Sequence, residues 1–183
     1  MSLIYLVRHA EPAATWGAHP NPGLSELGHQ QAKAASQTLK SVGAGSLWTS
    51  PLARCQETAR PTAEAIGCVP HIESRVAEIP VPADVVDHRA WLTQVMSGSW
   101  QDSHVDPRLR DWRDQIGQAL LEITEDTLVF SHFVAINAAV GLASQSDRVT
   151  CFKPGHASMT ILRNTGGILN VESLGEEAPI RLT

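Results

Sequence analysis

Residues 3–11 decide the fold, and they read Leu3-Ile4-Tyr5-Leu6-Val7-Arg8-His9-Ala10-Glu11. The run from 3 to 7 is short, apolar and rich in residues that favour β-structure, as expected of a strand buried on both faces of a parallel sheet. The polar pair Arg8 and His9 follows directly where this run ends. The pattern therefore predicts a central strand with chemically active side chains at its carboxyl end.

Helices and strands alternate outward from this strand. Ser25 is suited to cap the first helix, and Gly67 to terminate the second. The expected elements, in order, are a helix at 25–42, a strand at 46–50, a helix at 52–67, a short strand at 69–72, a helix at 108–123, a strand at 127–131, a helix at 133–143, and a hairpin of 158–163 with 168–173. This alternation predicts an α/β fold, a three-layer α/β/α sandwich around a mostly parallel sheet.

The length and one irregular segment predict the domain organisation. A chain of 183 residues suits one globular domain, so we expect residues 1–183 to form a single domain. Clear periodicity is lost between Pro80 and Pro107. We interpret residues 79–107 as an insertion within that domain, a small cap over the carboxyl ends of the strands.

Composition and charge exclude several classes of partner. The formal net charge is −5 and the 14 Lys and Arg residues are scattered, so we expect no nucleic-acid partner. No apolar run approaches the length of a membrane span, so we expect no membrane partner and a cytoplasmic location. The 3 cysteines show no Cys-x-x-Cys spacing, which favours neither a disulfide framework nor a zinc knuckle. The oligomeric state stays open, with a homodimer as one option.

Basic and imidazole side chains follow three of the expected strands. Arg8 and His9 come after the first strand, Arg54 after the second, and His132 after the strand at 127–131. The carboxyl ends of parallel strands share one edge of a sheet, where ligands bind, so these side chains can meet. Guanidinium forks match phosphate oxygens, and a helix starting after His132 adds backbone N–H donors. The arrangement predicts a pocket for a phosphoryl group.

Within this pocket, His9 is the expected nucleophile. A neutral histidine attacks phosphorus through one ring nitrogen when the other is held as a donor, typically to a backbone carbonyl. The cations Arg8 and Arg54 disfavour a further positive charge, so the free base should dominate at neutral pH. The same cations stabilise the charge that spreads over the transferring oxygens.

A leaving alkoxide needs a proton, and Glu78 is the best-placed donor, between apolar residues on the rim before the insertion. Burial there raises the pKa of the carboxyl, while the nearby arginines lower it. Once the alcohol departs, the carboxylate can activate water to hydrolyse the phosphohistidine. Glu11 is the rival acid.

Four motifs occur in order along the chain. They are Arg8-His9-Ala10-Glu11, Leu24-Ser25-Glu26-Leu27-Gly28, Ser50-Pro51-Leu52-Ala53-Arg54-Cys55-Gln56-Glu57-Thr58-Ala59, and Ser131-His132. Together they resemble the histidine phosphatase superfamily, the phosphoglycerate mutase-like proteins, over nearly the whole chain. The resemblance implies His9 as nucleophile, a phosphate pocket of Arg8, Arg54 and His132, and Glu78 as proton donor.

Two features depart from the family pattern. The family usually has small residues after the second histidine, whereas this chain has Phe133-Val134, so we expect Phe133 to contact the substrate and narrow the site. Mutase members also carry extra basic residues in the insertion to hold a second anionic group. The basic or imidazole residues available there are mainly His88, Arg89, His104 and Arg108. Hydrolysis is therefore favoured over mutase activity.

We expect a phosphomonoester hydrolase that acts on a small phosphorylated metabolite through a covalent phosphohistidine, with no metal and no cofactor. The other histidines show no paired spacing typical of metal ligands. Thr15 and Asn21, in the loop after His9, are candidates to reach the phosphate, with a purely structural role in turns as the alternative. The alternatives are a phosphoglycerate mutase-like phosphotransferase, a phosphohistidine-protein phosphatase and a non-catalytic phospholigand-binding module. A pure binder has no need of an acid such as Glu78.

Overall fold

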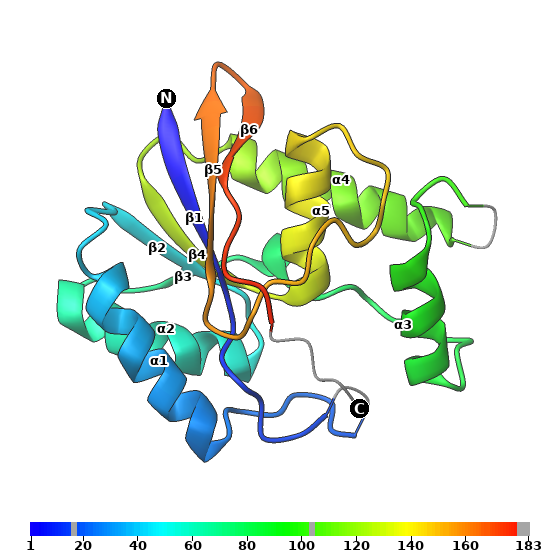
Figure 1. Cartoon of the computed structure of the whole chain (residues 1–183), viewed down its shortest axis with the longest axis horizontal. Coiled ribbons are helices and arrows are strands. Elements are labelled where there is room, and N and C mark those ends of the chain that lie inside the picture. Colours follow the sequence, from blue (N-terminus) through cyan, green and yellow to red (C-terminus); the bar gives the residue numbers. More distant parts are fainter. Residues whose placement is uncertain (16–17, 103–104, 179–183) are drawn as a thin grey trace.

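A mixed sheet lies at the centre of the computed structural model, which describes residues 1–15, 18–102 and 105–178. Its strand order is β3-β2-β4-β1-β5-β6 (Figure 1). The strands are β1 (Ser2–Arg8), β2 (Ser46–Thr49), β3 (His71–Ile72), β4 (Thr127–Ser131), β5 (Met159–Thr165) and β6 (Ile168–Ser173). Strands β1 to β4 pair in parallel, and the pairs β1–β5 and β5–β6 are antiparallel. The predicted α/β class with a mostly parallel sheet is confirmed.

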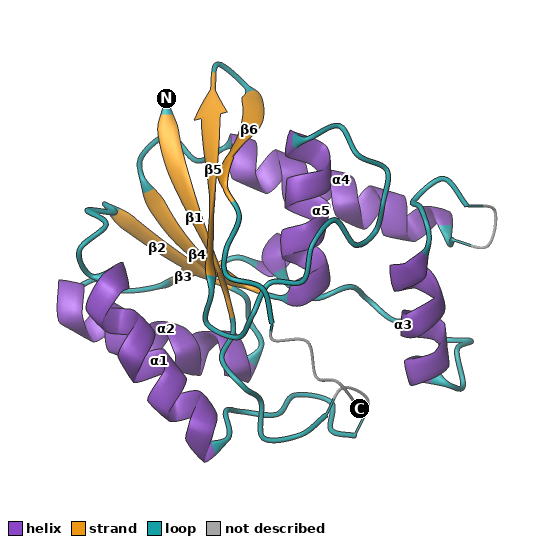
Figure 2. Ribbon diagram, viewed as in Figure 1, coloured by secondary structure: helices purple, strands orange, loops and turns teal. Residues whose placement is uncertain are grey.

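Helices cover both faces of this sheet, as Figure 2 shows. Helices α1 (Glu26–Leu39) and α2 (Ala53–Ile66) lie on one face, and α4 (Pro107–Leu121) and α5 (Phe133–Ala143) lie on the other. None of these helices, nor any other in the described ranges, has the length and apolar character needed to span a bilayer.

The apolar run of β1 supplies both cores because successive side chains of a strand point to opposite faces. Ile4 and Leu6 belong to the core formed with α4 and α5. Tyr5 and Val7 belong to the core formed with α1 and α2. The strand is therefore continuously apolar from Leu3 to Val7, whereas a half-exposed strand would alternate apolar and polar residues.

Local signals set most element ends. The Ser25 hydroxyl accepts a hydrogen bond from the Gly28 N–H at 3.0 Å and caps α1, which ends at Leu39, earlier than predicted. Helix α2 stops at Gly67, whose φ of 67° lies in the left-handed region that favours glycine. The β5–β6 hairpin turns through two residues of positive φ, Gly166 and Gly167.

The segment between the third strand and α4 contains a helix that the sequence analysis did not predict. Helix α3 (His88–Ser97) begins after Asp87, whose carboxylate accepts a hydrogen bond from the Ala90 N–H at 2.9 Å. It is short and mostly exposed, with Val95 as its one buried residue, so its apolar periodicity is weak. Helix α3 lies away from the sheet, near the N-terminal end of α4 (Figure 1).

Candidate active site

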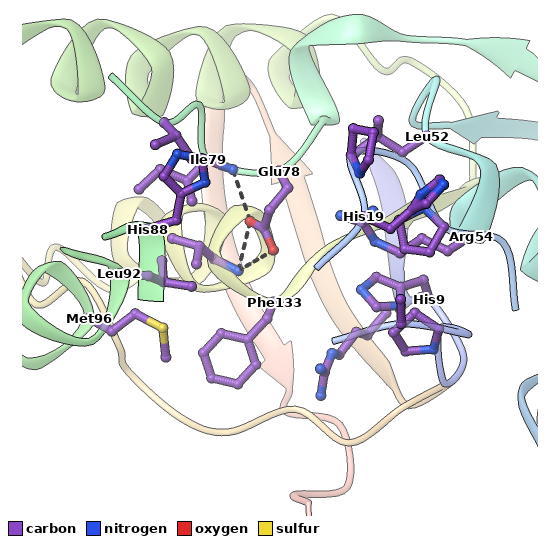
Figure 3. A pocket seen from close by; sticks show the side chains of 17 residues that line it. His9, His19, Leu52, Arg54, Glu78, Ile79, His88, Leu92, Met96 and Phe133 are labelled. Atoms are coloured by element: carbon purple, nitrogen blue, oxygen red, sulfur yellow. Dashed lines mark hydrogen bonds between the residues drawn. The ribbon is translucent and has the colours of Figure 1, made fainter. Parts of the chain in front are cut away.

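The carboxyl ends of β1, β2 and β4 are joined by backbone hydrogen bonds that continue past the strands. The His9 N–H donates to the Ser131 carbonyl at 2.9 Å, and the Ser50 N–H donates to the Phe130 carbonyl at 3.0 Å. A cavity of about 640 Å³ opens over this edge, and its wall includes Arg8, His9, Arg54 and Glu78 (Figure 3). The structure thus brings these four predicted site residues together.

His9 is held in one defined tautomer at the edge of the cavity. Its Nδ1 lies 2.8 Å from the Ala10 carbonyl oxygen, and since a carbonyl only accepts, Nδ1 carries the hydrogen. The Nε2 atom therefore keeps its lone pair. Burial lowers the pKa of His9 well below its ordinary value, Arg8 and Arg54 lower it further, and the bond to Ala10 opposes them. The ring is a neutral base with a nucleophilic nitrogen.

The loop that carries His9 is attached to α2 through a hydroxyl group. The Ala10 N–H donates to Thr58 Oγ1 at 2.9 Å, and this hydroxyl donates to the Arg54 carbonyl at 2.6 Å. Thr58 and Ala10 are both buried. One threonine therefore links the backbone of the expected nucleophile to that of Arg54. Thr58 lies in the motif of residues 50–59, but no local pattern indicates this link to the His9 loop.

The two arginines form the positive end of the cavity. Arg8 Nη1 donates to the Pro154 carbonyl at 2.8 Å, and the Arg8 guanidinium carbon lies 5.2 Å from the centre of the Phe133 ring. Burial lowers the pKa of Arg8 to about 10, which Glu78 partly opposes, so Arg8 remains a cation at neutral pH. Arg54 is buried, with 7% of its surface exposed, and Arg8 is partly buried. Both positive charges are thus largely shielded from solvent, where they act strongly on an anion.

Glu78 lies at the N-terminus of α5. Its Oε1 accepts hydrogen bonds from the Ile79 N–H at 3.0 Å and the Val134 N–H at 3.2 Å (Figure 3). Burial raises the pKa of this carboxyl above its ordinary value, although these N–H groups, Arg54 and Arg8 all lower it. A raised pKa is expected of a carboxyl that acts as a general acid, because it keeps its proton until the substrate needs it.

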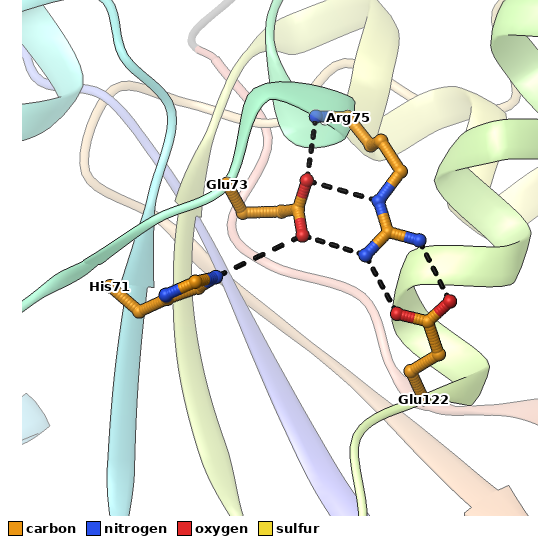
Figure 4. A network of polar contacts seen from close by, with 4 residues as sticks. All are labelled: His71, Glu73, Arg75 and Glu122. Carbon is orange, nitrogen blue, oxygen red and sulfur yellow. Dashed lines mark hydrogen bonds and ion pairs between the residues drawn. The ribbon is translucent and has the colours of Figure 1, made fainter.

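A polar network fixes the chain just before Glu78, at the 3-10 helix η1 (Ser74–Val76). The guanidinium of Arg75 bridges the carboxylates of Glu73 and Glu122, with N–O distances of 2.7 Å to each (Figure 4). Glu122 caps the end of α4. On the inner side, the Ser131 hydroxyl donates to the Val76 carbonyl at 2.7 Å. The network anchors η1 to α4 and β4, and thereby places Glu78.

His132 is completely buried beside His9, with ring centres 5.3 Å apart. Its Nε2 lies 2.7 Å from the Ser50 hydroxyl oxygen and 3.3 Å from Cys55 Sγ. Burial lowers the pKa of His132 well below its ordinary value, and His9 and Arg54 lower it further. His132 is not among the residues that line the cavity. Its direct contact with a phosphate therefore stays a prediction.

The remaining predicted residues are dispersed. Phe133 lines the cavity, whereas Thr15 is exposed and borders a different surface groove. The Asn21 side-chain oxygen accepts from the Ala53 N–H at 2.9 Å, at the start of α2. Glu11, the rival acid, accepts a hydrogen bond from the Ser25 hydroxyl at 2.8 Å. Neither Asn21 nor Glu11 is among the residues that line the cavity.

Three histidines that the sequence analysis did not place in the site lie near it. His19 and His88 line the cavity, and the ring centre of His156 is 5.9 Å from that of His9. They lie in or next to irregular segments, so no periodic pattern could have indicated them. His104, counted among the basic residues of the insertion, falls outside the described residues. Within the described part of the chain, no group of three or more His, Cys, Asp or Glu side chains could hold a metal ion.

Comparison with known proteins finds one matching family and relatives named as phosphoglycerate mutases. The family model described as "Histidine phosphatase superfamily (branch 1)" matches residues 4–177. A "Probable phosphoglycerate mutase GpmB" of Salmonella paratyphi C (strain RKS4594) is 27% identical over 173 residues, which cover 81% of this chain and 79% of that protein.

Solved structures share the fold. A mycobacterial glucosyl-3-phosphoglycerate phosphatase superimposes with a TM-score of 0.78 at 18% identity, over 96% of this chain and 99% of that one. A phosphoserine phosphatase of Entamoeba histolytica, solved in complex with 3-phosphoglyceric acid, gives a TM-score of 0.76 at 19% identity, over 96% of this chain and 98% of that one. At such identities the likeness shows the fold alone.

Proposed function

Since the chain belongs to the histidine phosphatase superfamily, branch 1, we propose that it hydrolyses phosphomonoesters through a covalent phosphohistidine at His9. The observation that carries the proposal is the His9 ring itself. Its Nδ1 is bonded to the Ala10 carbonyl at 2.8 Å, and the ring borders a cavity that also holds Arg8 and Arg54. A neutral imidazole beside two cations suits attack on a phosphate dianion, because the cations offset the charge of the ester.

In the first step, His9 Nε2 forms a bond to phosphorus while the bond from phosphorus to the ester oxygen breaks. Arg8 and Arg54 neutralise the charge on the three remaining phosphoryl oxygens. The departing oxygen takes a proton from Glu78, whose raised pKa favours the acid form. The products of this step are an alcohol, a phosphohistidine and the Glu78 carboxylate.

In the second step, a water molecule attacks the phosphorus. The Glu78 carboxylate takes a proton from that water, the bond between Nε2 and phosphorus breaks, and inorganic phosphate leaves. Glu78 then carries its proton again, and His9 is again a neutral base. The cycle consumes one water for each ester and needs no metal ion.

Hydrolysis is proposed ahead of mutase activity, although curated relatives are named as probable phosphoglycerate mutases. A mutase has to hold the carboxylate of phosphoglycerate as well as its phosphate. Among the described residues that line the cavity, Arg8 and Arg54 are the only ones of type Lys or Arg, and both lie near His9. No second fixed cation in this part of the wall serves a second anion.

The test is release of phosphate from p-nitrophenyl phosphate in the presence of EDTA. We expect turnover in the wild type, and a loss of at least a thousandfold in His9→Ala, in which the nucleophile is absent. His29→Ala is the matched control, since His29 is an exposed histidine on α1 away from the cavity. Mass spectrometry of rapidly quenched enzyme should find a phosphoryl group on His9.

Two outcomes would contradict the proposal. Unchanged turnover in His9→Ala would remove the nucleophile assignment, and loss of wild-type turnover in EDTA would contradict metal-independent catalysis. A phosphoglycerate isomerised faster than it is hydrolysed would identify a mutase instead.

A further inference from the structure

The cavity over His9 has two chemically different parts. Arg8, His9 and Arg54 form a positive part at the strand ends. The rest of the wall is largely apolar, and its α3-facing part is lined by Ile79, Val81, Leu92, Met96, Phe133 and Val134. Glu78 lies between the two parts (Figure 3). A phosphate bound beside His9 would therefore direct its ester group past Glu78 towards the apolar wall.

Helix α3 supplies a large share of that wall. Leu92 and Met96 are four residues apart, so they lie on the same face of α3. Figure 3 shows both side chains on the side of the cavity opposite His9, with the Phe133 ring nearby. Both are only partly buried and pack against the apolar core that underlies the cavity. They present an apolar surface that the described residues leave partly exposed.

Charge in the cavity disfavours an anionic ester group. The described lining has no Lys or Arg besides Arg8 and Arg54, and its other ionisable side chains are Glu78 and the imidazoles of His9, His19 and His88. A carboxylate on the substrate would lose water against the apolar wall with no guanidinium or ammonium group to replace it, and a buried charge without a partner is costly. The basic side chains of Arg89, Arg148 and Lys153 line a second surface groove, which shares Leu92 and Met96 with the cavity. None of these three basic residues lines the cavity itself.

We infer that the preferred substrates are phosphomonoesters of apolar, uncharged alcohols, whose alkyl or aryl group packs between α3 and the start of α5. The inference rests on the proposed phosphatase function and adds the chemical class of the leaving group. A cavity of about 640 Å³ holds a phosphate together with a hydrocarbon group of several carbons.

The test is a series of n-alkyl phosphates from ethyl to octyl. Their leaving groups have nearly equal pKa values, so differences in rate report contacts with the wall rather than chemistry. Each added methylene should raise kcat/KM about two- to fourfold until the wall is covered. 3-Phosphoglycerate should be hydrolysed with a kcat/KM at least tenfold below that of hexyl phosphate.

Leu92→Lys tests the assigned surface directly. A lysine there puts a charge into the apolar wall, so kcat/KM for hexyl phosphate should fall at least tenfold while that for ethyl phosphate changes less than threefold. The matched control is Gln94→Lys, on the same helix but outside the cavity wall. The control adds the same charge and should leave the chain-length dependence unchanged.

Failure of this inference is distinguishable from failure of the proposed function. If p-nitrophenyl phosphate is hydrolysed in a His9-dependent manner but kcat/KM does not rise with chain length, or 3-phosphoglycerate is the best substrate, the inference is wrong and the phosphatase stands. If nothing is hydrolysed, calorimetric binding of non-hydrolysable alkylphosphonates still measures the preference of the cavity. Affinity that does not increase from methyl- to hexylphosphonate would then overturn it.

Discussion

Replacement of Thr58 by valine should weaken both stability and catalysis. Valine keeps the branched shape of threonine, so packing at this fully buried position is preserved and only the hydroxyl is lost. The Arg54 carbonyl still has its helical partner in α2. The Ala10 N–H, in contrast, loses the acceptor that lies 2.9 Å away. A buried donor left without a partner costs about 1–3 kcal/mol, and we expect the free energy of unfolding to fall by that amount.

The effect on catalysis follows from the hydrogen bond between the Ala10 carbonyl and the His9 ring. The Ala10 carbonyl holds His9 Nδ1 at 2.8 Å and thereby aims Nε2 into the cavity. A shift of about 1 Å in a reacting group can reduce a rate on the order of a hundredfold, so kcat should fall tenfold to a hundredfold. The KM should change little, because Arg8 and Arg54 still bind the phosphate. Thr58→Ser, which restores the hydroxyl, should recover most of kcat.

Urea unfolding and steady-state kinetics with p-nitrophenyl phosphate measure the two effects. Thr62→Val is the matched control, because Thr62 is buried on the same helix and its hydroxyl has no hydrogen-bond partner among the described residues. That change should cost less than about 0.5 kcal/mol. If Thr58→Val keeps a kcat within twofold of the wild type, the hydroxyl does not position His9. If the free energy of unfolding is also unchanged, the Ala10 N–H does not depend on the Thr58 hydroxyl as its acceptor.

Two further predictions concern Glu78 and the buried histidines. Glu78→Gln keeps an oxygen that can accept from the Val134 N–H, so the protein should fold. The kcat/KM, which reports the steps up to release of the alcohol, should fall about a hundredfold to ten-thousandfold for alkyl phosphates and far less for p-nitrophenyl phosphate. An equal loss on both substrates would assign the acid to another residue. His9 and His132 are buried with lowered pKa values, so below about pH 6.5 the unfolded chain binds protons that the folded chain does not. Stability should therefore be complete above that pH and decrease below it by up to about 1.4 kcal/mol per pH unit per histidine. Urea midpoints between pH 7 and pH 5 measure this slope; His132→Gln should reduce it, and a flat wild-type profile would contradict the predicted linkage.

The sequence by itself determined the α/β class, the order of its main elements and the grouping of Arg8, His9 and Arg54 at the strand ends. The reason is that these features are encoded locally. A strand buried on both faces reads as a continuous apolar run, as β1 does from Leu3 to Val7, and residues that follow parallel strands share one edge of the sheet. Arg8, His9 and Arg54 could therefore be placed together without any knowledge of the packing.

Only the tertiary structure decided which groups support these residues and what surrounds them. Thr58 contacts Ala10 across 48 positions of the chain, and Ser50 reaches His132 across 82, separations at which no periodic pattern operates. Helix α3 was missed because it buries a single residue, yet its Leu92 faces the cavity. The placement of Arg8, His9 and Arg54 at the strand ends follows from local sequence. The apolar wall arises from packing between distant segments, because hydrophobic contact depends on proximity in space and not on order along the chain.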